Sequence, residues 1–132
     1  MLTDSKAYSG FAVKELAKAK EFYGETLGLK TEVLDEENGL MQLEHGGGKV
    51  TLCYQQADST PASYTILNFP VDDIDQAVDE LSSKGVSFER YEDFPFEQDA
   101  KGIARGITAN QGPDIAWFKD PSGNVLSVLQ ES

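Results

Sequence analysis

Apolar residues are spaced along the chain in a pattern that occurs twice. Residues 11–19 match residues 69–77, apolar position for apolar position, at a constant offset of 58. In both copies the apolar spacing changes from every second residue to every third or fourth, which predicts a strand leading into a helix. A glycine, Gly28 or Gly85, follows each helical pattern and is expected to end it. The sequence therefore predicts an internal repeat.

The elements after each helix follow from the same spacing and from turn residues. Asn38 and Gly39 predict a hairpin turn, and the 120–123 segment predicts a type I turn. The first copy is expected to contain a helix over 15–27 and strands over 7–13, 29–35, 40–44 and 49–55. The second is expected to contain a helix over 73–84, capped by Asp72 or Asp73, and strands over 64–71, 86–91, 115–119 and 125–130. Each half thus reads β-α-β-β-β.

The repeat also predicts how the chain is organised. At 132 residues the chain is expected to form a single domain over 1–132, with repeat modules at approximately 5–56 and 63–131. The last strands of the two copies match at an offset of 76, which aligns Thr51 with Ser127. Two copies of one unit build a shared concave surface, and sites tend to form between copies.

One segment departs from the repeat. Residues 93–113 are too many for an ordinary connection and contain Phe94, Phe96 and Arg105. Part of the segment, near 102–108, is expected to pair as an edge strand. The segment is either a lid over a pocket or a surface excursion tied down by its two phenylalanines.

Composition and charge limit the partners that the protein is expected to bind. The net charge of −12 disfavours nucleic acids and anionic membranes, and it favours cationic ligands, although an acidic surface also serves solubility alone. No apolar run has the roughly 20 residues of a membrane helix. The single cysteine, Cys53, allows no internal disulfide. We expect a cytoplasmic protein that binds no nucleic acid and no membrane.

The chain resembles a known protein family. Val13, Leu16, Ala19, Phe22 and Tyr23 in the first copy, the sequence Leu27-Gly28-Leu29, the second copy and the run 118–124 (Phe-Lys-Asp-Pro-Ser-Gly-Asn) are similar to the vicinal oxygen chelate superfamily. This group holds glyoxalases, bleomycin-resistance proteins and extradiol dioxygenases. The resemblance implies an α+β fold in which two β-α-β-β-β modules form a curved, mostly antiparallel sheet that cups a pocket. The fold hosts unrelated activities, so the activity depends on the residues of the site.

The resemblance also implies where a metal would bind. The metal enzymes of the family hold a divalent ion with His and Glu ligands from the first and last strand of each module. In this sequence the corresponding positions are Tyr8, Thr51, Ile66 and Ser127. Isoleucine offers no donor and neutral hydroxyls are poor ligands. We therefore expect no metal site and no cofactor.

Strand alternation around these positions predicts the lining of the cup. If Thr51 points inward, Cys53 and Gln55 follow, while Val50, Leu52 and Tyr54 pack on helices. Ile66 brings Asn68 inward, and the hairpins bring Gln42, Glu44, Ala116 and Phe118. Trp117 is core in a regular ladder but enters the cup if a bulge intervenes. The expected ligand-binding residues are Tyr8, Gln42, Thr51, Cys53, Gln55, Ile66, Asn68, Phe118, Ser127 and Arg105.

Catalytic residues are not identified by the sequence. Cys53 with His45 could form a nucleophile and base, and Glu44 or Tyr8 could act as a metal-free acid or base, but structural roles explain all four. We expect metal-independent binding of a small organic molecule, cationic or aromatic, of the resistance or sequestration type, by a homodimer. The alternatives are a lyase, isomerase or dioxygenase of the same superfamily, and a non-catalytic module that binds a partner.

Overall fold

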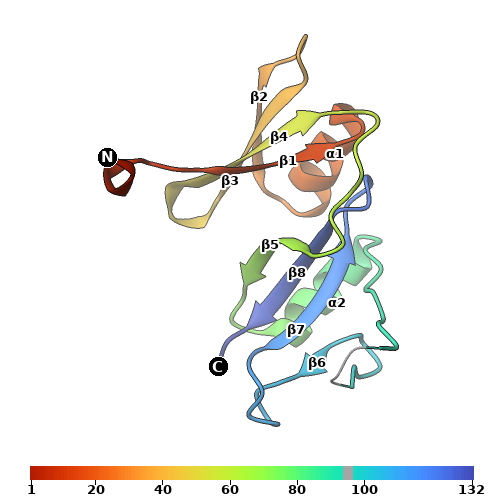
Figure 1. Ribbon diagram of the computed structural model, residues 1–132. Coiled ribbons are helices and arrows are strands. Elements are labelled where there is room, and N and C mark those ends of the chain that lie inside the picture. The colour runs from red at the N-terminus through yellow and green to blue at the C-terminus, as the bar shows by residue number, and fades with distance from the viewer. Residues whose placement is uncertain (94–96) are drawn as a thin grey trace. The chain divides into compact units, whose positions relative to one another are not determined.

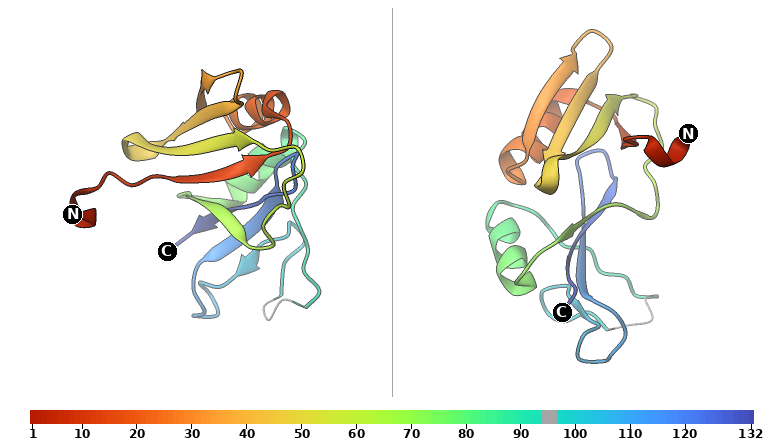
Figure 2. Two further views of the ribbon diagram at one scale, coloured as in Figure 1. Left: turned by 45° about the horizontal axis from the view of Figure 1, so that its top comes forward. Right: turned by 90° about the vertical axis from the view of Figure 1, so that its left-hand side faces the viewer.

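The structure is a computed structural model and describes residues 1–93 and 97–132. The chain divides into two compact units, a first unit of Met1–Pro61 and a second unit of Ala62–Ser132. Each unit contains one four-stranded sheet with a helix against one of its faces (Figures 1 and 2).

The first unit follows the predicted order of elements. Its regular elements are η1 (Leu2–Asp4), β1 (Ser9–Val13), α1 (Leu16–Lys20), η2 (Glu21–Thr26), β2 (Lys30–Asp35), β3 (Leu40–His45), η3 (Gly46–Gly48) and β4 (Lys49–Gln55). The strand order is β1-β4-β3-β2, with β1 parallel to β4 and the other pairs antiparallel. The predicted single helix is α1 continued by the π-helix η2, in which the Leu27 amide donates to the carbonyl of Phe22 five residues earlier.

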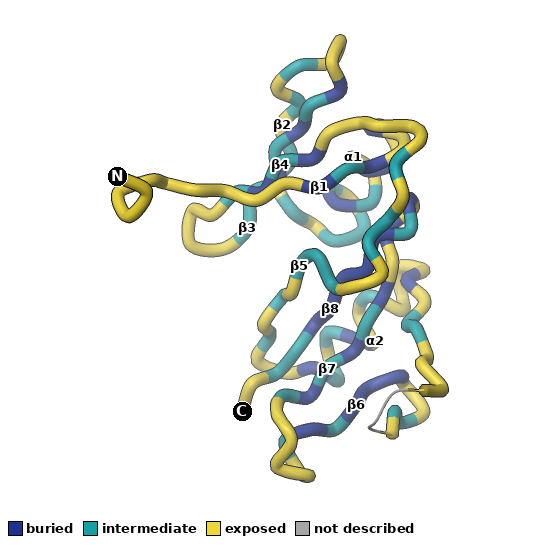
Figure 3. Tube along the Cα trace, in the orientation of Figure 1, coloured by how far each residue is buried: buried dark blue, intermediate teal, exposed yellow. Residues whose placement is uncertain are grey.

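The second unit repeats this arrangement with one change. Its elements are β5 (Thr65–Pro70), α2 (Ile74–Ser83), β6 (Ala104–Arg105), β7 (Asp114–Lys119) and β8 (Val125–Gln130). The strand order is β5-β8-β7-β6, again with one parallel pair, β5 and β8. Asp73 caps α2 by accepting a hydrogen bond from the Gln76 amide (3.1 Å). Strand β8 is buried over most of its length (Figure 3).

The predicted strand over 86–91 is wrong. This stretch makes one isolated bridge, between Phe88 and Phe118, and the Glu89 amide donates to the carbonyl of Trp117 (2.8 Å). The other end of β7 pairs instead with β6. The edge of the second sheet is thus shared by two short pieces of chain. The chain leaves the sheet edge after Glu89, because the Tyr91 amide donates a hydrogen bond to the side chain of Gln98 (2.8 Å) and not to a neighbouring strand.

A glutamine side chain joins the last strand to the start of the helix in both units. In the first unit Oε1 of Gln55 accepts the Leu16 amide (2.8 Å), and in the second Oε1 of Gln130 accepts the Ile74 amide (3.0 Å). Each bond satisfies an amide that lacks a partner within its own helix. Since Gln55 and Gln130 occupy equivalent places, the last strands align at an offset of 75, and the predicted offset of 76 is wrong by one residue.

The α+β fold with two β-α-β-β-β modules, each carrying a four-stranded mixed sheet, is confirmed. That the two units together form a single domain stays a prediction. Among the described residues, no helix has both the length and the apolar character needed to cross a bilayer.

Candidate functional site

The glutamine bridges show which face of each sheet meets the helix. Alternate residues of a strand share a face, so Cys53 and Thr51 face the helix with Gln55. The register places Phe11 and Met41 beside Cys53, and the Phe11 ring lies 5.6 Å from that of Tyr23 on η2. The opposite face, which we call the open face, carries the residues between them.

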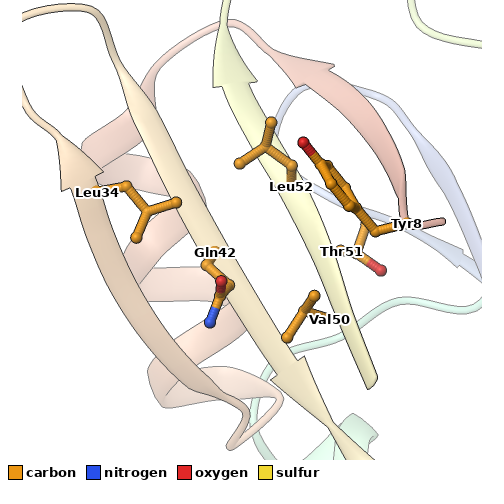
Figure 4. A pocket seen from close by; sticks show the side chains of 6 residues that line it. All are labelled: Tyr8, Leu34, Gln42, Val50, Thr51 and Leu52. Carbon is orange, nitrogen blue, oxygen red and sulfur yellow. The ribbon is translucent and has the colours of Figure 1, made fainter. Parts of the chain in front are cut away.

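The open face of the first unit carries a cavity with a mostly apolar lining. A cavity of about 200 Å³ lies over the strands, and Figure 4 shows its side chains with the helix behind the sheet. Tyr8 and Leu34 stand at its two sides and are 66% and 50% exposed, so the cavity is accessible to solvent. Its lining consists of Tyr8, Leu34, Gln42, Val50, Thr51 and Leu52, of which Thr51 belongs to the helix face by strand alternation and directs its hydroxyl to His45.

The polar chemistry of this cavity is limited. The lining contains no carboxylate, imidazole, thiol or amine, and Gln42 supplies the one amide group. Glu44, on the same face, forms an ion pair with Lys30 across the neighbouring strand (3.5 Å). The arrangement can hold an apolar surface and orient it by hydrogen bonds, but it places no strong acid or base within the lining.

Three predicted orientations in the first unit are wrong. Thr51, Cys53 and Gln55 do not point to the open face: Cys53 is buried under the helix, Gln55 caps that helix, and the Thr51 hydroxyl lies 2.9 Å from Nε2 of His45. Val50 and Leu52, expected against the helix, lie on the open face instead. The cause is the register, which pairs Gln42 with Leu52 and Glu44 with Val50.

The open face of the second unit carries a different row of side chains. Trp117, Ser127 and Asn68 are direct neighbours on β7, β8 and β5. The Ser127 hydroxyl is fully buried and donates to Oδ1 of the exposed Asn68 (2.6 Å). The Tyr91 ring meets the Trp117 ring edge-on at 5.5 Å. Burial and the Glu89 carboxylate raise the pKa of the Tyr91 phenol, so Tyr91 is neutral at physiological pH.

Two further expectations for the second unit are corrected. Phe118 is fully buried on the helix face, opposite Leu126, and Trp117 takes the open face without a bulge in β7. Ile66 lies at an irregularity between Thr65 and Leu67, where two steps on β5 match one on β8. The irregularity interrupts the alternation between Ile66 and Asn68, and the role of Ile66 as a ligand contact stays a prediction.

Arg105 is held by carboxylates, and its role as a ligand contact stays a prediction. Its guanidinium makes two hydrogen bonds to Asp75 on α2 (2.7 and 3.0 Å), and its Nε donates to Asp99 (3.0 Å). The bonds from Arg105 lower the pKa of Asp75 to about 2. Lys101 binds Asp79 on the same helix (3.0 Å). The described part of the predicted lid is therefore fastened to α2, while Phe94 and Phe96 lie outside the described residues.

The residues at the positions implied for a metal do not fit a divalent ion. Tyr8 is an exposed phenol, Thr51 faces the helix, Ile66 has no donor atom, and the Ser127 hydroxyl is bonded to Asn68. Within residues 1–93 and 97–132, no three His, Cys, Asp or Glu side chains gather in a group that could hold a metal ion.

Comparisons with known proteins agree with this architecture. An uncharacterised protein of Bacillus subtilis (strain 168), YraH, is 25% identical over 89% of this chain and 91% of its own length. A glyoxalase/bleomycin resistance protein/dioxygenase superfamily member from Sphaerobacter thermophilus has a similar fold, with a TM-score of 0.70 at 24% identity over 98% of this chain and all of its own. The antibiotic-binding protein TnmS3 of Streptomyces sp. CB03234 gives a TM-score of 0.67 at 24% identity over 98% of both chains.

A family model also matches most of the chain. Residues 7–128 fit the family model described as Glyoxalase/Bleomycin resistance protein/Dioxygenase superfamily, which covers both units and all eight strands except the end of β8. The chain therefore belongs to the glyoxalase/bleomycin resistance protein/dioxygenase superfamily.

Proposed function

We propose that this protein binds a small organic molecule on the open face of the first unit, without a metal ion, and sequesters it unchanged. The observation that carries the proposal is the lining of the cavity: aliphatic and aromatic surface with one amide group and no ionisable side chain except the Tyr8 phenol. Such a lining favours binding through apolar contact and hydrogen bonding over proton transfer or metal-assisted chemistry.

Two further observations support this function. TnmS3, which has a similar fold, is an antibiotic-binding protein, so the fold is compatible with holding an organic molecule. The net charge of −12 attracts cations and repels anions, which favours a cationic or neutral ligand over a carboxylate or phosphate. An aromatic cation would also gain from the exposed ring of Tyr8.

The experiment is native mass spectrometry of protein purified from its own host, followed by titration with three naphthalene probes. The probes are 2-naphthylmethylammonium, 2-naphthamide and 2-naphthoate, which differ mainly in charge. We expect a retained organic molecule of fixed mass, and affinity that falls from the cation to the anion. Tyr8→Ala should weaken the retained molecule or the cationic probe three- to tenfold, the effect of one aromatic contact.

The matched control is Tyr64→Ala, which removes an equally exposed tyrosine (71% against 66%) outside the cavity. Binding should be unchanged in this variant. Equal losses in the two variants would contradict the proposed cavity, as would a protein that retains no molecule and binds none of the probes. Turnover of the retained molecule into a product of different mass would favour the alternative, an enzyme of the same superfamily.

We also propose that the protein is a homodimer in its own cell. Each sheet ends in edge strands, β1 and β2 in the first and β5 and β6 in the second, and an uncovered edge readily pairs with another chain. Several large apolar side chains, including Leu34 and Tyr54, are exposed. Light scattering should give twice the mass of the 132-residue chain at micromolar concentration, and a stable monomer would overturn this proposal.

A further inference from the structure

The row formed by Trp117, Ser127 and Asn68 has a feature that its counterpart in the first unit lacks. The offsets of 58 and 75 align these residues with Gln42, Leu52 and Gly10. The first unit therefore has an amide on β3, that of Gln42. At the β1 position it has Gly10, which has no side chain. The second unit instead has an amide on its edge strand, fixed by a buried hydroxyl.

The hydrogen bond between Ser127 and Asn68 sets the direction of that amide. The Ser127 hydroxyl is fully buried, and within the described residues its partner is Oδ1 of Asn68. A buried hydroxyl proton without an acceptor costs more than an unused lone pair, so the carbonyl end of the amide is held against Ser127. Nδ2 of Asn68 is then turned away from Ser127, and among the described residues it has no partner. An exposed residue thus presents a fixed hydrogen-bond donor.

The surroundings decide what kind of acceptor this donor would meet. The second unit contains 13 acidic and 5 basic residues, against 10 and 6 in the first, so its net charge is −8 compared with −4. This field repels carboxylates and phosphates and leaves uncharged acceptors. Trp117, two strands away from Asn68, lies about 10 Å along the row, a distance that an aromatic ring with an attached carbonyl can span.

We propose that Asn68 is a specificity-determining residue that donates a hydrogen bond from Nδ2 to an uncharged carbonyl or amide oxygen of an aromatic ligand. Ser127 is a positioning residue, since it is buried and acts through Asn68. The ligand lies along the row on the open face of the second unit, towards Trp117. This inference rests on the proposed function only in taking the ligand to be a small organic molecule.

The test uses the full chain labelled with ¹⁵N and the probe 2-naphthamide. Two signals report on the row directly: the side-chain NH₂ of Asn68, assigned by its loss in Asn68→Leu, and the indole N–H of Trp117, the chain's single tryptophan. We expect 2-naphthamide to shift both signals. We expect 2-naphthylmethylammonium, which has no acceptor, to shift the Trp117 signal without shifting that of Asn68.

Variants separate specificity from a structural effect. Asn68→Asp replaces the donor by a carboxylate, so it should weaken 2-naphthamide about fivefold, the value of one neutral hydrogen bond, and strengthen the ammonium probe. Ser127→Ala should also weaken 2-naphthamide, and Ser127→Thr, which keeps the hydroxyl, should restore it. The matched control is Gln76→Leu, which removes an exposed amide on α2, outside the row, and should leave the Asn68 shift unchanged.

Several outcomes would overturn the inference. One is an Asn68 signal that stays still at millimolar 2-naphthamide, and another is an unchanged probe preference in Asn68→Asp. Equal losses in Ser127→Ala and Ser127→Thr would show that Ser127 matters only for packing. These results differ from failure of the proposed function, because that function is tested by Tyr8→Ala in the first unit, with Tyr64→Ala as its control.

Discussion

The two units share one scaffold but use its edge differently. In the first unit the fourth strand is the six-residue β2, which pairs with β3 through most of its length. In the second unit the same edge is divided between a single bridge at Phe88 and the two-residue β6, and the intervening chain is fastened to α2 by Arg105 and Lys101. A repeated module can therefore replace a full edge strand by a longer connecting segment, provided that ion pairs fasten this segment to the rest of the module.

The comparison extends to the open faces. At equivalent places the first unit has Gln42 and Leu52, and the second has Trp117 and Ser127. The helix faces are alike, because Leu43 and Phe118 are both fully buried. Packing thus fixes the side of each sheet that meets its helix, while the open side is free to differ between the two units.

The largest expected effect tests whether the helix faces are equivalent. Phe118→Ala and Leu43→Ala each empty a fully buried position, and we expect losses of about 3–5 and 2–5 kcal/mol in the free energy of unfolding. Denaturant unfolding should be followed by Trp117 fluorescence, which reports on the second unit, and by far-ultraviolet circular dichroism, which reports on both. If the Phe118→Ala protein kept its native stability but bound its ligand poorly, this result would contradict the placement of Phe118 on the helix face.

A smaller effect tests the shared glutamine bridge. Gln55→Ala and Gln130→Ala each leave a helix amide without its acceptor, so each should cost about 1 kcal/mol of unfolding free energy. Hydrogen exchange at the Leu16 and Ile74 amides should accelerate only in the unit that carries the change. A stability loss in one variant and none in the other would show that the two bridges are not equivalent.

Low pH should weaken the contact between Asp75 and Arg105, which lies in the second unit, and so lower the stability of that unit. The pKa of Asp75 is lowered to about 2, so the Asp75–Arg105 contact stabilises the fold above about pH 4 and is lost as the pH falls through 2. Arg105→Met should return the Asp75 pKa towards its usual range and reduce the loss of stability between pH 4 and 2. Because the pair is half-exposed, the effect should be small and should shrink in salt.

Carbon-13 NMR titration of the Asp75 carboxyl measures this pKa directly. The matched control is Arg90→Met, because Arg90 donates to the carbonyl of Ala100 and not to a carboxylate. Asp75 should titrate near 2 in this control, as in the unchanged protein. A normal Asp75 pKa in the unchanged protein would remove Arg105 as the fastener of the segment.

The smallest expected effect is that of metal removal. Neither unit offers imidazole or carboxylate donors at the positions implied for a metal, so EDTA should leave the unfolding midpoint unchanged. Metal analysis should find less than one divalent ion per chain after purification without chelators. One tightly held Ni, Zn, Fe or Mn per chain would contradict metal-independent binding.

Much of the fold was predictable, because apolar spacing and turn residues act locally. Gly28 and Gly85 end the helical regions, Asp73 caps α2, and both modules contain the predicted strand–helix start. The strand over 86–91 failed because its apolar alternation competes with long-range contacts. The side chain of Gln98 accepts a hydrogen bond from the Tyr91 amide, and Arg105 donates one to Asp99, so this part of the chain is held away from the sheet edge. Such contacts leave no periodic signal in the sequence.

The faces of the strands were harder to predict than the strands themselves. A shift of one residue in register reverses every side chain, so one wrong offset moved Thr51 and Cys53 to the open face. A mistake in pairing β7 with β8 did the same to Phe118. The repeated glutamine at the end of each last strand, Gln55 and Gln130, was a usable signal, because aligning the two gives the offset of 75 that the structure has.

The glutamine bridges also bear on how each unit folds. The bonded residues are 39 positions apart in the first unit and 56 in the second, so the Leu16 and Ile74 amides lack these acceptors until the last strand has joined its sheet. Formation of each helix is thereby coupled to completion of the whole module. Chain closures over this distance slow folding, and they favour modules that form completely or not at all. A module truncated before its last strand would lack both the glutamine acceptor for its helix start and the strand that joins β1 to β3 in the first unit or β5 to β7 in the second.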